Sequence, residues 1–328
     1  MVVLKVGLIG AGGMGGVHAR QYAKMNDVEV RFFDRSADKT VEFAQRTGYH
    51  SATSMEQLLD WADCMDICLP TDLHVDCAIS CIERQKPTLV EKPMALDIEQ
   101  CQKLIAAEKQ HQVKVMPAQV LRWFPEYRKG HFLVQEGTVG NPGAVRMRRG
   151  GKAPVGFEGW FQDIKRSGGV LLDLAIHEFD WLRWTFGEVE SVLARSVRFN
   201  QPELEAAGDY ALITLKFKSG CVGHVEATWM DPSGFRTMFE VCGSEGMIEH
   251  DSRRIGVIRA HTASGSQAEN PMHQFDDPYY LQIRSFLDAV RDDSPLPVST
   301  HDGMMAVAIA RACIESASTG ALVTVPTL

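Results

Sequence analysis

The sequence has no long hydrophobic run and no excess of positive charge. No apolar stretch approaches the roughly 18 consecutive residues that a membrane-spanning helix requires. The net charge is −8 over 328 residues, which argues against a nucleic-acid or anionic-membrane surface but leaves the charge of a local cleft open. The first apolar strand begins at Val3, so we expect no signal peptide. We therefore expect a globular, cytoplasmic protein with no membrane and no nucleic-acid partner.

The sequence also lacks a C-x-x-C pair, although it contains eight cysteines. Cys64/Cys68 and Cys77/Cys81 are four residues apart, which on a helix would place two thiols on one face. Cys68, however, lies in an apolar, strand-like run. A zinc site would need better-spaced Cys or His partners. We expect reduced, buried cysteines and no metal site.

A glycine-rich motif, G-A-G-G-M-G beginning at Gly10, lies between an apolar strand and a helix-like segment. Gly10 permits a tight turn, Gly12 leaves room for a pyrophosphate, and Gly15 lets the helix pack closely on the strand. The helix N-terminus offers N–H groups and a positive dipole end to phosphates. Asp34 ends the second apolar strand, at the spacing typical of a ribose-binding acid. Together these features predict a dinucleotide-binding site.

The first third of the chain alternates apolar strands with helical segments. The expected strands are 3–9, 28–33, 64–69, 88–90 and 113–116, and the expected helices are 16–25, 37–47, 55–61, 73–84 and 98–110. Ser54 and Asp97 are expected N-caps, and Gly48 is an expected helix end. This alternation predicts a doubly wound parallel sheet.

From residue 122 the pattern changes to long alternating strands separated by glycine-containing turns. Strands are expected at 192–199, 210–218, 221–229, 236–242 and 247–249, and helices at 124–136, 170–186, 280–291 and 303–318. Residues 137–143 are expected to form a turn, and 262–270 is the most loop-like stretch. We therefore expect an α/β chain with a Rossmann domain at residues 1–121. An α+β domain with a large, mostly antiparallel open sheet is expected at residues 122–328.

The tripeptide Glu91-Lys92-Pro93 ends the fourth apolar strand. Because ligands bind at the carboxyl ends of such strands, it shares one rim with Gly10, Asp34 and Pro70-Thr71. A lysine there can bind a substrate hydroxyl and stabilise a developing alkoxide. Pro93 restricts Lys92 to an extended backbone and is compatible with a cis peptide. The alternative is a solvated lysine beside a turn proline.

A third motif, S-G-G-V-L-L-D-L-A-I-H-E-F-D, runs from Ser167 to Asp180. Asp173 and His177 are four residues apart, so they share one face of the expected helix among apolar neighbours. A histidine titrates near neutral pH and can accept a hydroxyl proton while hydride leaves. The alternative is a core histidine whose partner is Asp173.

These motifs resemble those of the glucose–fructose oxidoreductase, inositol dehydrogenase and rhizopine-catabolism (Gfo/Idh/MocA) family. The resemblance covers nearly the whole chain. Its landmarks are Gly10–Gly15 with His18 and Asp34, Pro70-Thr71 with His74, Glu91-Lys92-Pro93, Gly168-Gly169 with Asp173 and His177, and V-C-G-S-E-G at 241–246. The run I-H-E-F-D-W-L-R-W at 176–184 is most similar to the inositol dehydrogenase branch.

The resemblance implies roles for individual residues. His177 would be the general acid/base, Lys92 the proton relay and hydroxyl binder, and Asp173 a group that holds the substrate or tunes the pair. The implied substrate-binding residues are Lys92, Arg122, Trp160, Asp173, His177 and Tyr279. The implied cofactor-binding residues are Gly10, Gly12, Gly13, Met14, Gly15, Asp34, Arg35, Leu69, Pro70, Thr71, His74, Glu91, Lys92 and Gln119. The resemblance also implies a homodimer or homotetramer assembled through the C-terminal sheet.

Two positions depart from the family pattern. Ala175 replaces a glycine that many members carry, and Leu121 stands where an asparagine often precedes the arginine, here Arg122. The second departure leaves the substrate open. The alternative for Arg122 is a surface arginine packed beside Trp123 and Phe124.

The acid of the fingerprint bears on the choice of cofactor. Asp34 can accept a hydrogen bond from a ribose 2′-hydroxyl and would repel a 2′-phosphate. Arg35 can stack on adenine or bind that phosphate, so NADP stays possible, although NAD is favoured.

The sequence predicts an NAD(P)-dependent dehydrogenase acting on a secondary hydroxyl of a cyclic polyol or sugar. One alternative is a non-catalytic dinucleotide-binding regulator, against which Lys92, Asp173 and His177 argue because a sensor needs no acid/base pair. The other is an enzyme that cleaves glycosides through transient NAD-dependent oxidation.

Overall fold

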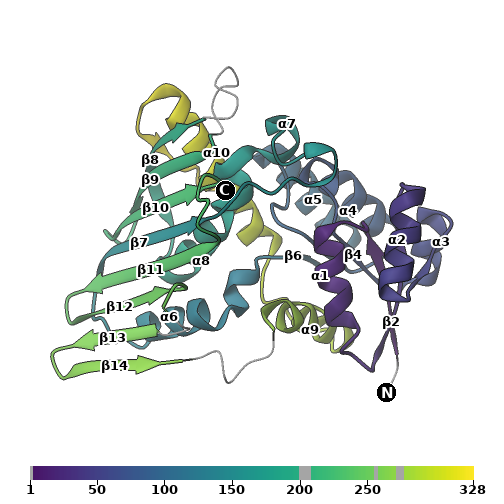
Figure 1. Cartoon of the computed structure of the whole chain (residues 1–328), viewed down its shortest axis with the longest axis horizontal. Helices are drawn as coiled ribbons and strands as arrows, with labels where there is room; N and C mark the ends of the chain where they lie inside the picture. The colour runs from purple at the N-terminus through teal and green to yellow at the C-terminus, as the bar shows by residue number, and fades with distance from the viewer. Residues whose placement is uncertain (1–2, 199–207, 255–257, 271–276) are drawn as a thin grey trace. The chain divides into compact units, whose positions relative to one another are not determined.

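The computed structural model describes residues 3–198, 208–254, 258–270 and 277–328 (Figure 1). The chain divides into two compact units. The first comprises Met1–Gln119, Gly156–Trp160 and Asp276–Met304, and the second comprises Val120–Val155, Phe161–Phe275 and Met305–Leu328. Among the helices of the described residues, none is both long enough and apolar enough to cross a membrane.

The first unit is built on a parallel sheet with six strands in the described residues, in the order β3-β2-β1-β4-β5-β6. The strands are β1 (Leu4–Ile9), β2 (Val28–Phe33), β3 (His50–Ser51), β4 (Cys64–Ile67), β5 (Thr88–Val90) and β6 (Val115–Pro117). β1 pairs in parallel with β2 on one side and with β4 on the other. The chain thus reverses its progress across the sheet between β1 and β4, which is where doubly wound sheets bind ligands. The predicted doubly wound sheet is confirmed.

The helices of the first unit follow the predicted order. They are α1 (Gly13–Tyr22), α2 (Ala37–Thr47), α3 (Met55–Trp61), α4 (His74–Glu83), α5 (Ile98–His111), α9 (Pro278–Arg291) and the short η1 (Thr71–Leu73) and η3 (Phe157–Gly159). Ser54 and Asp97 cap α3 and α5 as predicted, each accepting a backbone N–H three residues ahead. Gly48 ends α2 at a φ of 74°, in the left-handed region that favours glycine. α1 begins at Gly13 rather than at residue 16, because the glycines continue directly into helical backbone.

The second unit contains a mixed sheet with nine strands in the described residues, in the order β14-β13-β12-β11-β7-β10-β9-β8-β15. They are β7 (Pro142–Gly150), β8 (Val189–Val197), β9 (Tyr210–Phe217), β10 (Val222–Thr228), β11 (Arg236–Gly243), β12 (Gly246–Asp251), β13 (Ile258–Thr262), β14 (Gly265–Glu269) and β15 (Val323–Thr324). β7 and β10 pair in parallel, and the other neighbouring pairs are antiparallel. The predicted large, mostly antiparallel sheet is confirmed.

Four strands of the described part of this sheet, β7, β13, β14 and β15, were not among the predicted strands. β7 begins inside the predicted turn 137–143, and its alternation is hidden because Arg149 takes an inward position beside Val145 and Met147. The stretch 262–270 was expected to be a loop, but β13 and β14 form a hairpin there. Every residue of β14 is exposed, so it carries no apolar alternation to signal a strand. Residue 199, the predicted end of one strand, lies outside the described residues.

The second unit also contains the helix that carries His177. Its helices are η2 (Val120–Trp123), α6 (Pro125–Gln135), α7 (Ile164–Ser167), the π-helix η4 (Val170–Leu174), α8 (Ile176–Phe186) and α10 (Thr300–Thr319), whose residues are divided between the two units. The buried rings of Tyr127, Trp181 and Phe239 join α6, α8 and β11, with centroids 5.1–5.6 Å apart. The prediction of a single α-helix over residues 170–186 is wrong at its start, because residues 170–174 form a π-helix. There the N–H of Ala175 donates to the carbonyl of Val170, five residues back.

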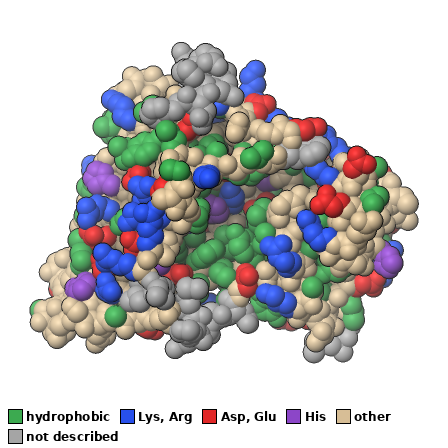
Figure 2. All heavy atoms as spheres, viewed as in Figure 1, with side chains coloured by type: hydrophobic (Ala, Val, Ile, Leu, Met, Phe, Trp, Pro, Cys, Tyr) green, Lys and Arg blue, Asp and Glu red, His purple; other side chains and the backbone are tan. Residues whose placement is uncertain are grey.

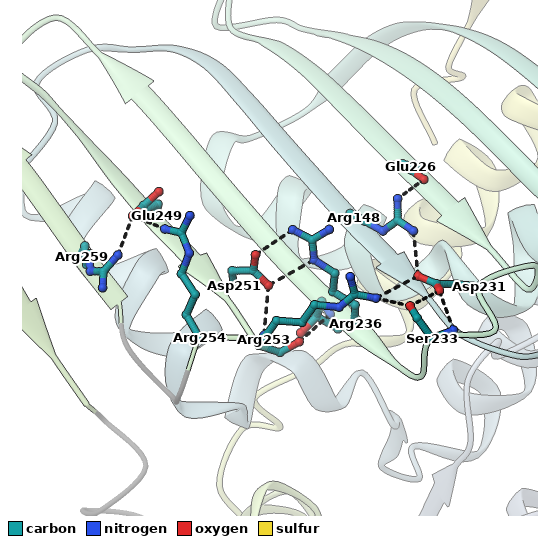
Figure 3. Close-up of polar contacts among 12 residues, drawn as sticks. Arg148, Glu226, Asp231, Ser233, Arg236, Glu249, Asp251, Arg253, Arg254 and Arg259 are labelled. Carbon is teal, nitrogen blue, oxygen red and sulfur yellow. Dashed lines mark hydrogen bonds and ion pairs between the residues drawn. The ribbon is translucent and has the colours of Figure 1, made fainter.

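The open face of the nine-stranded sheet, opposite the buried rings of Trp181 and Phe239, carries charged side chains in pairs. Figure 3 shows Arg148 beside Glu226 and Asp231, and Arg236 beside Asp251. Basic and acidic side chains are intermingled over this sheet in Figure 2. Because these arginines lie beside carboxylates, the described residues of Figure 3 do not form a basic stripe of the kind that binds nucleic acid.

Candidate active site

The turn after β1 shows why glycine occupies two of its positions. Gly10 has a φ of 103°, and a Cβ there would lie 2.6 Å from the carbonyl oxygen of Cys68. A Cβ on Gly15 would collide with the carbonyl oxygen of Gly10. Any larger residue at these positions would therefore separate α1 from the strands β1 and β4.

The N-terminus of α1 has the shape required for a pyrophosphate. A Cβ on Gly12 or Gly13 would meet no atom within 4 Å, so open space lies beside the turn. The first intrahelical bond of the turn runs from the N–H of Gly16 to the carbonyl of Gly12. The N–H groups of Gly13, Met14 and Gly15 precede that bond, as the donors of an anion-binding helix start do. The turn therefore fits a dinucleotide phosphate.

Asp34 is held against this turn. One carboxylate oxygen accepts the N–H of Ala11 at 2.9 Å, and the other accepts the N–H of Ser36 at 2.8 Å. Each oxygen retains a second lone pair with which to accept a ribose hydroxyl. Arg35 is exposed beside it. The carboxylate is thus preorganised by backbone N–H groups, as the fingerprint requires.

The loops that follow β4 and β6 present unsatisfied polar atoms. Thr71 is 1% exposed and Gln119 is 1% exposed. Within the described part of the chain, the Thr71 hydroxyl and both amide atoms of Gln119 lack a hydrogen-bond partner. Buried polar atoms without partners are costly unless a ligand satisfies them. Together with half-buried Leu69 and Pro70, they mark a place where a cofactor fits.

His74 ties the loops after β4 and β5 together. Its Nδ1 lies 2.7 Å from the carbonyl oxygen of Pro93, and its Nε2 lies 2.8 Å from that of Leu69. Burial lowers the pKa of His74, although both carbonyls favour the protonated ring. The side chain therefore acts as a bridge between two backbone segments on the rim of the sheet.

The peptide bond between Lys92 and Pro93 is cis. Lys92 is half-buried, whereas Glu91 is 4% exposed. The Glu91 carboxylate accepts the N–H of Lys92 at 3.0 Å and lies 3.2 Å from the Nε2 of His18. Glu91 is thus engaged with the protein itself, which supports the loop that bears Lys92.

A buried polar cluster that sequence reasoning did not predict lies behind this loop. The Nδ1 of His18 lies 2.8 Å from the carboxylate of Asp66, which also accepts the hydroxyl of Tyr22 at 2.8 Å. Burial alone would lower the pKa of His18, but Asp66 and Cys68 raise it well above its usual range. The available signal was an aspartate inside the apolar strand β4, where an unpaired carboxylate would be costly.

The second unit places Asp173 and His177 on consecutive helical turns. Asp173 lies in the π-helix and is 4% exposed, and His177 lies in the first turn of α8 and is half-buried. Because the π turn is wider than an α turn, the simple i, i+4 relation used in the prediction does not describe this pair. π turns are frequent at functional sites.

Two buried ion pairs anchor the part of α8 that directly follows His177. Arg149 of β7 donates from its Nε to both carboxylate oxygens of Glu178, at 2.7 and 2.9 Å. Arg122 donates from Nε and Nη2 to Asp180, at 2.9 and 2.7 Å. All four side chains are nearly inaccessible to solvent. These pairs restrict where the helix can carry His177.

Arg122 was predicted to contact substrate. The structure places its guanidinium in the pair with Asp180 and 5.5 Å from the centre of the Trp184 ring. It is buried rather than a surface residue. The substrate contact therefore stays a prediction, and the observed contacts support a role in holding α8.

The remaining predicted substrate residues belong to the first unit. Trp160 follows η3 and is half-buried. Tyr279 lies in the first turn of α9, and its ring centre is 6.2 Å from that of His18. Tyr279 thus borders the buried cluster behind the lysine loop.

A depression of about 600 Å³ lies on the open face of the nine-stranded sheet. Its lining includes Arg148, Tyr210, Asp231 and Arg253, and none of the predicted site residues. Arg148 and Arg253 both pair with Asp231 (Figure 3). Because its charges already satisfy one another, this depression lacks the converging reactive groups of an active site.

Comparison with known proteins identifies the chain's relatives. Residues 4–119 match the model of an oxidoreductase family with an NAD-binding Rossmann fold, and residues 132–326 match that family's C-terminal alpha/beta domain. The myo-inositol 2-dehydrogenase of Thermotoga maritima is 28% identical over 95% of this chain and 96% of its own length. The inositol 2-dehydrogenase of Rhizobium meliloti is 28% identical over 96% of this chain and 97% of its own length.

A solved structure agrees with these matches. GenD2 from gentamicin A biosynthesis, in complex with NAD, is 26% identical and superimposes with a TM-score of 0.85 over 100% of this chain and 97% of its own. The match extends over both units. With the glycine turn, the anchored Asp34 and the unsatisfied atoms of the rim, it shows that the chain belongs to the Gfo/Idh/MocA oxidoreductase family and is an NAD(P)-dependent oxidoreductase.

Proposed function

We propose that the protein oxidises a secondary hydroxyl of a cyclic polyol or sugar, with an inositol as the leading substrate class. The observation that carries the proposal is that two relatives matched over nearly the whole chain are named inositol 2-dehydrogenases, and that the chain carries Lys92, Asp173 and His177, the residues to which the family resemblance gives the reactive roles. A polyol supplies hydroxyls of the required kind. Bound NAD supplies the acceptor for the hydride.

His177 accepts the proton of the reacting hydroxyl. Its ring is half-buried on an anchored helix, so it is accessible yet held in place. Imidazole is suited to this step because it changes protonation near neutral pH. Asp173, buried one turn earlier, holds the substrate or tunes His177.

Lys92 binds the same hydroxyl and stabilises the alkoxide as the proton leaves. A fixed cation acts most strongly where charge develops in the transition state. The bond from the Lys92 N–H to Glu91 and the bridge from Pro93 to His74 hold the backbone on both sides of this residue. The lysine can therefore act without a large reorganisation.

NAD is the proposed physiological cofactor. Asp34 faces the turn with a carboxylate that can accept a 2′-hydroxyl and would repel a 2′-phosphate. Arg35 is exposed next to Asp34 and is a cation that would favour NADP. Titration of both dinucleotides by calorimetry tests this choice, and tighter binding of NADP would refute it.

The direct test is nicotinamide absorbance with purified protein, NAD or NADP, and a panel of inositols, aldoses and sugar acids at mildly alkaline pH. Reduction of NAD by inositols or sugars would support the proposal and name the substrate class. No reduction, with NAD bound normally, would favour a sensor. Release of sugar from a glycoside without net cofactor reduction would instead favour glycoside cleavage.

We also propose that the protein forms a homodimer or homotetramer through the open face of the nine-stranded sheet. Four apolar side chains project from β8, β9 and β10 on that face, and Leu212 and Val197 are 52% and 47% exposed; the other two are Leu193 and Val222. Such a patch beside paired charges is typical of an interaction surface. A monomeric mass by light scattering would refute the proposal.

We place the protein in the cytoplasm. All eight cysteines are free thiols, and most are buried. Free thiols persist where the surroundings are reducing. Cell fractionation tests this placement.

A further inference from the structure

His18 occupies the centre of the buried cluster in the first unit. It projects from α1 between two carboxylates, with Nδ1 2.8 Å from Asp66 and Nε2 3.2 Å from Glu91. His18 and Asp66 are fully buried, and the Glu91 side chain is 6% exposed. The ring therefore connects the first helix to β4 and to the loop after β5.

The contacts of the ring favour its protonated form. Nδ1 makes a hydrogen bond with Asp66, whereas Nε2 lies 3.2 Å from Glu91, within ion-pair distance but without hydrogen-bond geometry. A positive charge on the ring attracts both carboxylates, which a neutral imidazole does not. The charge also offsets part of the cost of burying two carboxylates in the same place.

The other groups facing His18 remain neutral. Cys68 lies 3.4 Å from Nδ1, and burial raises the pKa of its thiol. Burial and the nearby Asp66 raise the pKa of Tyr22 as well, whose hydroxyl donates to that carboxylate. The ring of Tyr279 lies alongside at 6.2 Å. Asp66 and Glu91 are therefore the groups that hold the imidazolium.

His18, Asp66 and Cys68 could also be considered as metal ligands, since their donor atoms lie within 4.8 Å of one another. The 2.8 Å separation of Nδ1 and the Asp66 oxygen argues against that. Two ligands about 2.0 Å from a tetrahedral zinc lie roughly 3.3 Å apart. The observed separation is that of a direct hydrogen bond.

Glu91 transmits the position of His18 to the neighbouring lysine. One carboxylate oxygen meets His18, while the other accepts the N–H of Lys92 at 3.0 Å. The N–H of Glu91 donates to the carbonyl of Ile67 in β4 at 3.0 Å. Both oxygens of the Glu91 carboxylate and the backbone of Glu91 are thus held in place. Rotation of the carboxylate would break its hydrogen bond with the Lys92 N–H.

We propose that protonated His18 is a positioning residue for Lys92, acting through the Glu91 carboxylate that binds both the imidazolium and the Lys92 N–H. This rests on the proposed function, in which Lys92 stabilises the alkoxide. Displacement of such a group by about 1 Å is enough to cost about 10²-fold in rate. His18 itself need not touch the substrate or the cofactor.

Two uncharged variants of His18 distinguish the contribution of Nδ1 from that of Nε2. The amide nitrogen of His18→Asn reproduces Nδ1 and can donate to Asp66, whereas that of His18→Gln reproduces Nε2 and can donate to Glu91. Both remove the positive charge, so they are matched in that respect. We expect His18→Asn to lower kcat by at least about 10-fold with an unchanged Kd for NAD, and His18→Gln to retain most of kcat.

Tyr22→Phe is the control for a merely structural effect. It removes a hydrogen bond to the same buried Asp66 without touching Glu91. We expect it to lower thermal stability while leaving kcat close to that of the parent. Equal losses of kcat in His18→Asn, His18→Gln and Tyr22→Phe would overturn the proposal.

A second readout needs neither substrate nor NAD. In protein labelled with ¹⁵N-lysine, the amide resonance of Lys92 reports its hydrogen bond to Glu91. We expect that resonance to move in His18→Asn and to stay near its original position in His18→Gln and Tyr22→Phe. An unmoved resonance in His18→Asn overturns the proposal.

Glu91→Gln covers the case in which His18→Asn does not fold. His18 and the Lys92 N–H lie against different oxygens of the Glu91 carboxylate, and glutamine replaces one of these oxygens with an NH₂ group that cannot accept. We expect the same displaced Lys92 resonance and the same loss of kcat. If the parent is inactive but the Lys92 resonance moves in the variant, the proposed dehydrogenase is refuted and the role of His18 is not. If the parent is active but the Lys92 resonance does not move in the variant, the role of His18 is refuted and the dehydrogenase is not.

Discussion

Replacing Asp180 with asparagine tests whether α8 is held by a buried ion pair. The Asp180 and Arg122 side chains are 2% and 8% exposed, and two hydrogen bonds of 2.7 and 2.9 Å join them. The isosteric amide keeps the volume but removes the charge that compensates the guanidinium. Breaking a buried pair at one partner typically costs about 3–5 kcal/mol. That corresponds to roughly two to four orders of magnitude in the unfolding equilibrium.

Urea unfolding followed by tryptophan fluorescence measures this change, because Trp181 and Trp184 lie on the same helix. Glu190→Gln is a suitable control, since its partner Lys216 is 56% exposed and water screens the pair. We expect only a small change there. A loss below about 1 kcal/mol in Asp180→Asn would show that the pair behaves like a surface salt bridge and would refute the reasoning.

The double variant Arg122→Met/Asp180→Leu separates stability from substrate binding. Replacing both charges with apolar groups of similar size is often neutral or stabilising, so we expect most of the lost stability to return. If Arg122 holds α8 rather than the substrate, KM stays close to that of the parent. A large rise in KM with restored stability would instead support the substrate contact implied by the family resemblance.

Four further outcomes follow from the site. Lys92→Ala and His177→Ala should each lower kcat by about 10²–10⁴-fold while calorimetry shows NAD bound normally; unchanged turnover in both would remove them from the mechanism. Asp34→Ala should weaken NAD binding and narrow the preference over NADP, and calorimetry that finds NAD bound as tightly as by the parent contradicts the assigned role. Gly15→Ala should reduce stability and NAD affinity together, because its Cβ would meet the Gly10 carbonyl; normal values in denaturation and calorimetry would argue against the close packing of α1. The pKa of His18 is raised in the folded protein above the roughly 6.5 of an unfolded histidine. Its ion pairs therefore stabilise fully below that pH, and the contribution is lost as pH rises through the raised value. The stability gap between the parent and His18→Gln should narrow at alkaline pH, and a gap that widens would contradict the charged assignment.

Local patterns were sufficient for much of the first unit. The short elements β3, η1 and η3 were not predicted, but the order of the longer strands and helices follows from periodicity. The caps at Ser54 and Asp97 and the end of α2 at Gly48 follow from capping chemistry between near neighbours. The start of α1 was placed three residues late, because a glycine-rich segment has no side chains that distinguish a turn from a helix start.

The second unit was harder to predict because its signals are spread over distant parts of the chain. β7 was missed because Arg149 faces inward, and that is favourable only beside Glu178 on α8. β14 was missed because strand pairing with β13, and not burial, holds it in place. The π turn around Asp173 depends on how the backbone winds and not on residue type.

The sequence by itself determined the dinucleotide fingerprint and the alternation that specifies a parallel sheet, because both depend on residue type at short spacing. The trio Lys92, Asp173 and His177 was proposed through the family resemblance. The tertiary structure decided that His18 lies between Asp66 and Glu91 and that Arg122 pairs with Asp180. His18 and Asp66 are 48 residues apart in the sequence, and Arg122 and Asp180 are 58 residues apart. A charge is stable in the interior only beside its partner, and which residues become partners depends on the completed fold.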